Sequence, residues 1–190
     1  YSIKVPDGPL TSKLQKIKVG DTLWMKKKPT GTLVNDALIP GKRLYLFSTG
    51  TGIAPFASIV RDPETYEKFE QVVLTHTCRE VAELTYGHET VAKAKDDPLV
   101  GEEATAKLVH IDAATREPHA RTKRITAMIE DGSLFDEIGA PRLNPETDRV
   151  MICGSMDMLN DLKAACEAHG LEEGSNSRPG HYVIERAFVG

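Results

Sequence analysis

Short apolar runs recur along the chain from about residue 41 onward and alternate with longer amphipathic stretches. The runs are mostly continuous rather than alternating, which is typical of strands buried on both faces of a sheet. Strands are predicted over residues 43–48, 70–76, 106–112, 148–154 and 181–188, and helices over residues 54–61, 80–95, 124–131 and 156–169. Strands that alternate with helices indicate βαβ units. We therefore expect residues 41–190 to form a five-stranded, doubly wound parallel α/β domain.

The first 40 residues have a different pattern. They hold a β-rich stretch at residues 1–5, turn-forming residues at 6–9 and a short helical pattern that Thr11 or Ser12 can cap. Two or three strands and one short helix cannot enclose a core of their own. We expect residues 1–40 to be the end of a preceding β domain or an appendage packed on the α/β domain.

Composition and charge narrow the function classes. The 190 residues are 40% hydrophobic and 27% charged, with a formal net charge of −4. Residues 1–40 hold seven lysines and three aspartates, a local +4, whereas residues 41–190 hold 17 basic and 25 acidic residues, a local −8. The net acidity argues against a nucleic-acid-binding protein, and the lack of a long apolar run argues against a membrane protein.

The cysteines and histidines show no spacing typical of a metal site or a nucleophile triad. Cys78, Cys153 and Cys166 form no C-x-x-C pair, and the six histidines are scattered. We therefore expect free thiols, a cytoplasmic protein and no metal, and hydrolase chemistry is disfavoured.

The sharpest local motif follows the first predicted strand and opens a helix. It reads STGTGIAPF over residues 48–56. Glycines there permit a tight turn and close approach of a ligand, while the amino end of a helix attracts phosphate. The third glycine of the dinucleotide fingerprint is missing, so a structural turn without a ligand is the alternative.

Arginines follow several of the predicted strands. The second strand ends in HTCR, residues 76–79, where a NAD site would place Asp or Glu for the ribose 2′-hydroxyl. A guanidinium at Arg79 suits a 2′-phosphate instead. Arg116 follows the third strand and Arg124 opens the next helix. One arginine is more often a surface residue, but three at the carboxyl edge of one parallel sheet favour NADP over NAD.

The fourth predicted strand ends in CGS, residues 153–155. A buried structural cysteine is the usual interpretation of such a position. The neighbouring Gly154 would admit a flat ring, so a position facing a cofactor is the alternative for Cys153.

Together these stretches resemble the C-terminal portion of the bacterial ferredoxin (flavodoxin)–NADP reductase family. The resemblance is carried, in order along the chain, by VPDGPLTS at 5–12, TGTGIAPF at 49–56, HTCR at 76–79, TRE at 115–117, CGS at 153–155 and ERAFVG at 185–190. It implies that residues 1–40 are the C-terminal remnant of an antiparallel FAD-binding β-barrel and residues 41–190 the NADP-binding domain. The family's Arg-x-Tyr-Ser flavin motif is not in this sequence, and we expect it before Tyr1.

The resemblance also implies roles for individual residues. It implies catalytic positions at Cys153 and Phe188 beside the reacting rings. Cofactor contacts are implied for Tyr1, Gly8, Pro9, Leu10, Thr11, Ser12, Gly50, Thr51, Gly52, Arg79, Thr115, Arg116, Arg124, Cys153, Gly154, Ser155, Ala187 and Phe188. Residues 9–11 would meet the FAD diphosphate, the three arginines the 2′-phosphate side of NADP, and residues 153–154 the nicotinamide.

The implied activity is hydride transfer between NADP(H) and FAD, with one-electron exchange to an acidic ferredoxin or flavodoxin. Lysines 26–28 would steer that carrier, although they suit a solvated face equally well. We expect a monomer without nucleic-acid or membrane partners. Two alternatives are an NADP-binding fragment without turnover and the reductase component of an oxygenase system.

Overall fold

The computed structural model describes residues 7–25, 27 and 31–186 and divides the chain into two compact units, Tyr1–Gly31 and Thr32–Gly190. This division lies before the boundary expected after residue 40. The first unit contains the helix α1 (Thr11–Leu14), whose N-cap residue is Leu10. Thr11 and Ser12 lie inside the helix rather than at its N-cap position, so the expected N-cap at Thr11 or Ser12 is wrong. The β-rich stretch at residues 1–5 lies outside the described residues.

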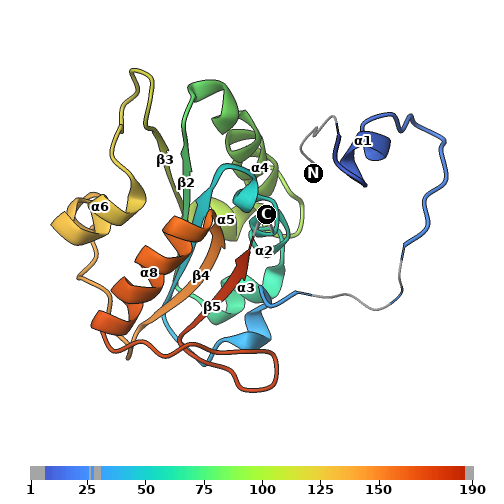
Figure 1. Ribbon diagram of the computed structural model, residues 1–190. Coiled ribbons are helices and arrows are strands. Elements are labelled where there is room, and N and C mark those ends of the chain that lie inside the picture. Colours follow the sequence, from blue (N-terminus) through green and yellow to red (C-terminus); the bar gives the residue numbers. More distant parts are fainter. Residues whose placement is uncertain (1–6, 26, 28–30, 187–190) are drawn as a thin grey trace. The chain divides into compact units, whose positions relative to one another are not determined.

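A five-stranded parallel sheet forms the centre of the second unit (Figure 1). Its strands are β1 (Arg43–Thr49), β2 (Gln71–Cys78), β3 (Leu108–Ala114), β4 (Asp148–Gly154) and β5 (Tyr182–Arg186). The strand order is β3-β2-β1-β4-β5, and every neighbouring pair is parallel. The five strands predicted from the apolar runs are confirmed.

Helices occupy the connections between the strands. They are η1 (Asn35–Ala37), η2 (Gly50–Ile53), α2 (Phe56–Ile59), α3 (Pro63–Lys68), η3 (Val81–Leu84), α4 (Thr85–Lys95), α5 (Gly101–Lys107), α6 (Ile125–Asp131), α7 (Ser133–Ile138) and α8 (Met156–Ala168). The predicted helices correspond to α2, to η3 with α4, to α6 and to α8. The short helices α3, α5 and α7 were not predicted.

Alternate strand residues point into two separate hydrophobic cores. Leu44 and Leu46 of β1 belong to the core that α2, α3, α4 and α5 cover, whereas Tyr45 and Phe47 belong to the core that α6, α7 and α8 cover. Figure 1 shows α6 and α8 on one side of the sheet and α2 to α5 on the other. Both faces are therefore covered, and β1, β2 and β4 each hold a continuous buried apolar run, at residues 44–47, 72–74 and 150–153. The doubly wound fold is confirmed.

The segment 32–39 packs on the α/β sheet and its helices. Leu33 and Leu38 are buried in the core that α2 to α5 cover. Thr32 Oγ1 donates a hydrogen bond of 2.7 Å to the carbonyl of Ile184 in β5. These contacts explain why the second unit begins at Thr32.

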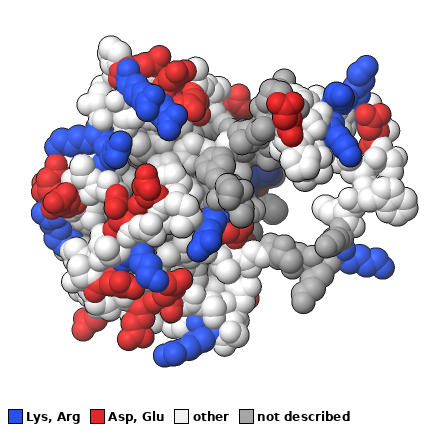
Figure 2. All heavy atoms as spheres, viewed as in Figure 1, with Lys and Arg blue, Asp and Glu red and all other residues white. Residues whose placement is uncertain are grey.

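The surface of the second unit mixes both signs of charge. On the face drawn in Figure 2, acidic and basic side chains are interspersed. The local charge of −8 over residues 41–190 is therefore not gathered into one patch on that face. In the described part of the chain, no helix is both long enough and apolar enough to span a membrane.

Candidate functional site

The strand order reverses between β1 and β4, because the chain builds the sheet outward from β1 in one direction and from β4 in the other. Open α/β sheets bind ligands outside the carboxyl ends of the strands at such a switch point. Here the backbone N–H of Ser155 donates to Thr49 Oγ1 at 3.2 Å and joins the two strand ends. A Cβ on Gly52 would lie 2.1 Å from the carbonyl oxygen of Cys153. Close packing of η2 on β4 thus accounts for Gly52.

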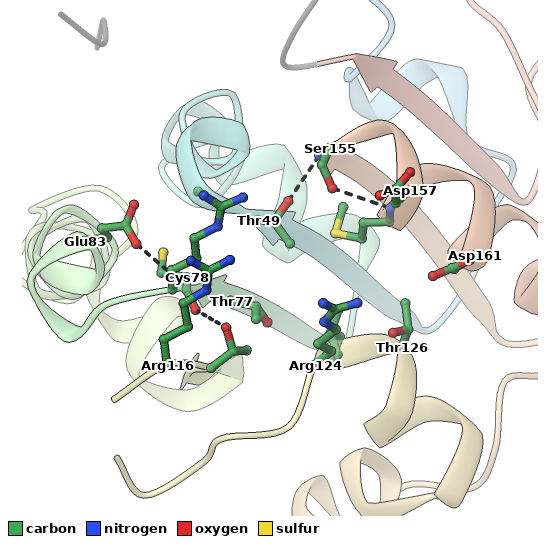
Figure 3. A pocket seen from close by; sticks show the side chains of 15 residues that line it. Thr49, Thr77, Cys78, Glu83, Arg116, Arg124, Thr126, Ser155, Asp157 and Asp161 are labelled. Carbon is green, nitrogen blue, oxygen red and sulfur yellow. Dashed lines mark hydrogen bonds between the residues drawn. The ribbon is translucent and has the colours of Figure 1, made fainter. Parts of the chain in front are cut away.

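A pocket of about 470 Å³ opens at this edge of the sheet (Figure 3). Its volume lies within the range of about 300–1,000 Å³ that is usual for small-molecule sites. Its lining comes from the carboxyl ends of β1, β2 and β3 and from the first turns of α6 and α8. The fold and the pocket therefore indicate the same place for a ligand.

Three arginines give the pocket its cationic side. Arg79 follows β2, Arg116 follows β3 and Arg124 is the N-cap residue of α6; all three are exposed and line the pocket. Figure 3 shows Arg116 and Arg124 reaching from the β3–α6 side toward Thr49 and Ser155. Within the described ranges, none of the three guanidinium groups forms a hydrogen bond or an ion pair. Converging cations without partners indicate an anionic ligand.

Backbone hydrogen bonds fix two of these arginines beside each other. The N–H of Arg116 donates to the carbonyl of Arg79 at 2.9 Å, and that of Thr115 to the carbonyl of Cys78 at 3.0 Å. Glu83 also lines the pocket, but its Oε2 accepts two backbone N–H groups at 2.9 Å, including that of Arg79. This carboxylate oxygen therefore holds the turn after β2.

The first two turns of α8 form an acidic side of the pocket. Asp157 and Asp161 are exposed there, and Ser155 caps the helix by accepting the N–H of Met158 at 3.5 Å. These two aspartates were not predicted as site residues, and neither were Thr77, Glu83 and Thr126 of the same lining. A spacing of four residues places two side chains on one helix face, so the pattern after Ser155 was the available signal.

Behind the pocket, β2 supports the turn that follows β1. Gly50 has a φ of +51°, in the left-handed region that favours glycine. His76 Nε2 lies 2.9 Å from the Gly50 carbonyl oxygen. Burial lowers the pKa of His76, so its ring is neutral at pH 7 and donates this hydrogen bond.

The thiols near the pocket are buried and protonated. Burial raises the pKa of Cys78 and of Cys153 to about 12, because a thiolate is poorly solvated there. Cys153 packs in the core that α2 to α5 cover and does not line the pocket. In the described part of the chain, no cluster of His, Cys, Asp or Glu is arranged to hold a metal ion.

Known proteins are similar to this chain both in sequence and in fold. The oxidoreductase NAD-binding domain family matches residues 46–164. The flavodoxin/ferredoxin–NADP reductase of Rhodobacter capsulatus is 53% identical over 190 residues, which cover all of this chain and 70% of that protein. The chain belongs to the ferredoxin/flavodoxin–NADP reductase family.

Two other members of the ferredoxin/flavodoxin–NADP reductase family agree with this. The ferredoxin–NADP reductase of Pseudomonas aeruginosa is 50% identical over all of this chain and 74% of that protein. The crystal structure of a ferredoxin NADP+ reductase from Neisseria gonorrhoeae with bound FAD and NADP has a TM-score of 0.81 and 29% identity. That match covers 97% of this chain and 72% of the other.

The residues predicted for a ferredoxin/flavodoxin–NADP reductase site fall into four groups. Gly50, Arg79, Thr115, Arg116, Arg124 and Ser155 line the pocket; Thr51, Gly52, Cys153 and Gly154 lie at the switch point without lining it; Gly8, Pro9, Leu10, Thr11 and Ser12 lie in the first unit. Tyr1, Ala187 and Phe188 lie outside the described residues. The geometry thus gathers the expected NADP ligands, and the roles of the individual residues stay predictions.

Proposed function

We propose that the pocket binds NADP(H) and that this chain is the NADP-binding part of a flavin-dependent reductase. The observation that carries the proposal is the convergence of the guanidinium groups of Arg79, Arg116 and Arg124, which have no hydrogen-bond or ion-pair partner among the described residues. Planar guanidinium groups match phosphate oxygens in charge and geometry. NAD has only a hydroxyl group at the 2′-position, so it would offer these cations no negative charge at that position.

The acidic residues that follow β2 support the same choice of cofactor. A NAD site uses a carboxylate after the second strand to bind the ribose hydroxyls. Glu80 and Glu83 lie in that region, but both are engaged in a capping box: the Glu80 side chain accepts the backbone N–H of Glu83, and Glu83 Oε2 accepts those of Arg79 and Glu80. The position directly after the strand is Arg79, which suits the phosphorylated ribose.

The residues of this chain would bind and orient the dinucleotide. The arginines would hold its 2′-phosphate end, and the turn at Gly50 together with the amino end of α8 would receive the diphosphate. When bound, the nicotinamide supplies hydride chemistry and FAD divides the electron pair into single electrons. The Cys78 thiol, with its pKa of about 12, is not suited to acid–base work at neutral pH.

Beyond this pocket, we propose a domain assignment, an electron carrier and an oligomeric state for the protein. The chain spans about 70% of the length of its Rhodobacter capsulatus relative. Residue patterns alone predict the boundary after residue 40; because Leu33 and Leu38 are buried in the α/β core, we propose that residues 1–31 are the end of an FAD-binding domain and residues 32–190 the NADP-binding domain. The names of the relatives support a ferredoxin or flavodoxin as the electron carrier. We propose a monomer, which sedimentation of the purified protein tests.

Replacement of Arg116 by alanine tests the choice of cofactor. We expect Arg116→Ala to raise the dissociation constant for NADPH at least about tenfold and that for NADH much less, since a charged hydrogen bond to phosphate is lost. The control is Arg61→Ala, because Arg61 is exposed, pairs with Asp97 at 3.2 Å and does not line the pocket. Equal losses for both nucleotides would contradict the 2′-phosphate assignment.

The visible spectrum of the full-length protein tests the reaction. We expect flavin absorbance and NADPH-driven reduction of an artificial electron acceptor. A colourless protein that binds NADP+ without turnover would contradict the reductase and leave a binding module. A co-purifying iron–sulfur cluster would favour a reductase component of an oxygenase system.

A further inference from the structure

Asp112, on the edge strand β3, lies outside the pocket lining and accepts hydrogen bonds from three side chains. Its Oδ2 accepts from His88 Nε2 at 2.8 Å and from His119 Nε2 at 3.0 Å. Its Oδ1 accepts from Arg121 Nη1 at 2.8 Å. The Asp112 side chain is only 14% exposed, so these donors rather than water satisfy most of the carboxylate.

The three donors come from two parts of the second unit. His88 is in α4, whereas His119 and Arg121 are in the segment 115–124 between β3 and α6. The guanidinium of Arg121 continues to Glu137 of α7, with Nε 2.8 and 3.0 Å from the two carboxylate oxygens. One carboxylate on β3 therefore ties the middle of this segment to α4 and, through Arg121, to α7.

The same segment has a pocket arginine at each end. Arg116 is near its start and Arg124 is its last residue, and the segment contains neither helix nor strand. Its backbone is held by Arg116, whose N–H donates to Arg79, and by the N–H of Ala114, which donates to the Arg121 carbonyl at 3.0 Å. A segment without regular structure takes its position from such anchors.

We propose that Asp112 is a positioning residue for binding of the 2′-phosphate. It holds the middle of the segment through His119 and Arg121, and thereby sets the spacing of the two pocket arginines at the segment ends. This inference rests on the proposed NADP(H) site. Arg121 serves as the anchor and not as a phosphate ligand, because two carboxylates already engage its guanidinium.

Asp112 must be ionised to hold the segment through these hydrogen bonds. Burial raises the pKa of Asp112, but hydrogen bonds from His88 and His119 outweigh this effect and hold the pKa below its usual value. The charged and titratable groups around it include His76 from β2, His88 from α4, His110 from β3, and His119 and Arg121 from the segment. The carboxylate is therefore anionic at neutral pH, and the bonds it accepts from Arg121 and the histidines keep their full strength.

Asp112→Asn in the full-length protein tests the inference by calorimetric titration with NADP+ and with NAD+. The amide keeps the shape but loses the charge and one acceptor oxygen. We expect the dissociation constant for NADP+ to rise about tenfold and that for NAD+ to change less than about twofold. The matched control is Asp97→Asn, whose side chain is 13% exposed and pairs with Arg61 away from the pocket lining. It should leave the ratio of the two constants unchanged.

His119→Ala provides a second variant, because it removes one donor from a segment without regular structure. His119→Ala should lower the preference for NADP+ by a smaller factor than Asp112→Asn. If Asp112→Asn does not fold, the same titrations on His119→Ala test the inference. Folded variants that keep the wild-type ratio would overturn the inference, as would an equal loss in Asp97→Asn. A wild-type protein without preference for NADP+ would instead overturn the proposed function.

Discussion

Gly52 makes the tightest backbone contact at the switch point. A Cβ there would lie 2.1 Å from the Cys153 carbonyl oxygen and 2.6 Å from its carbon, so η2 or β4 must move to accept alanine. We expect Gly52→Ala to lower the free energy of unfolding by about 3 kcal/mol. Gly139→Ala is the control, because φ is +65° and the space is open, and it should cost only about 1 kcal/mol. Equal urea denaturation midpoints would contradict this account.

His110 makes stability depend on pH. Burial lowers its pKa to about 4, and its Nε2 is buried without a hydrogen-bond partner in the described part of the chain. Because the folded pKa lies below that of the unfolded chain, about 6.5, the stabilisation is complete above pH 6.5 and is lost as the pH falls toward 4. The loss at acidic pH amounts to about 3 kcal/mol.

Removing the imidazole tests this dependence. We expect the unfolding free energy of His110→Leu to fall less steeply than that of the wild type between roughly pH 7 and pH 4.5. Urea denaturation at several pH values measures both curves. Parallel curves would show that His110 does not carry the effect; the burial of His76, whose pKa is also lowered, would then be the next cause to test.

At the scale of elements, α8 links helix capping to the pocket. Ser155 caps α8 by accepting the N–H of Met158, and it also lines the pocket. We expect Ser155→Ala to cost about 1 kcal/mol of stability and to weaken NADP+ binding. Asp62 caps α3 at 3.0 Å from the N–H of Glu64, away from the pocket lining. Asp62→Ala should therefore cost similar stability and leave binding unchanged; a loss of binding in both variants would contradict a local role for Ser155.

How far the sequence predicts these elements depends on what buries them. The strands were predictable because both faces are covered, which leaves continuous apolar runs. The helix α5 was not, because Ala104 is its one buried residue and a seven-residue helix holds barely two turns of periodicity. Arg79 and Arg116 follow strand ends and Arg124 opens a helix, so the pocket arginines were predictable. The Asp112 network was not, since its partners meet only after the chain has folded.

At the scale of the whole molecule, segment 32–39 belongs to the α/β unit. Leu33 and Leu38 are buried in its core, and Thr32 bonds to β5. We expect a fragment of residues 32–190 to be more stable than one of residues 41–190 by about 4 kcal/mol, mainly from burial of the two leucines. Urea denaturation of the two fragments measures the difference. Equal stabilities would place the structural boundary after residue 40.

Because its cysteines are buried, local opening of this molecule can be followed by cysteine alkylation. Burial raises the pKa of Cys78, Cys153 and Cys166 to about 12, and alkylating reagents react with thiolates that they can reach. The three thiols belong to β2, β4 and α8. Iodoacetamide should therefore modify each one only when its own element opens. Mass spectrometry of the alkylated peptides over time would then rank how large a fraction of molecules has β2, β4 or α8 open, in a protein without added labels.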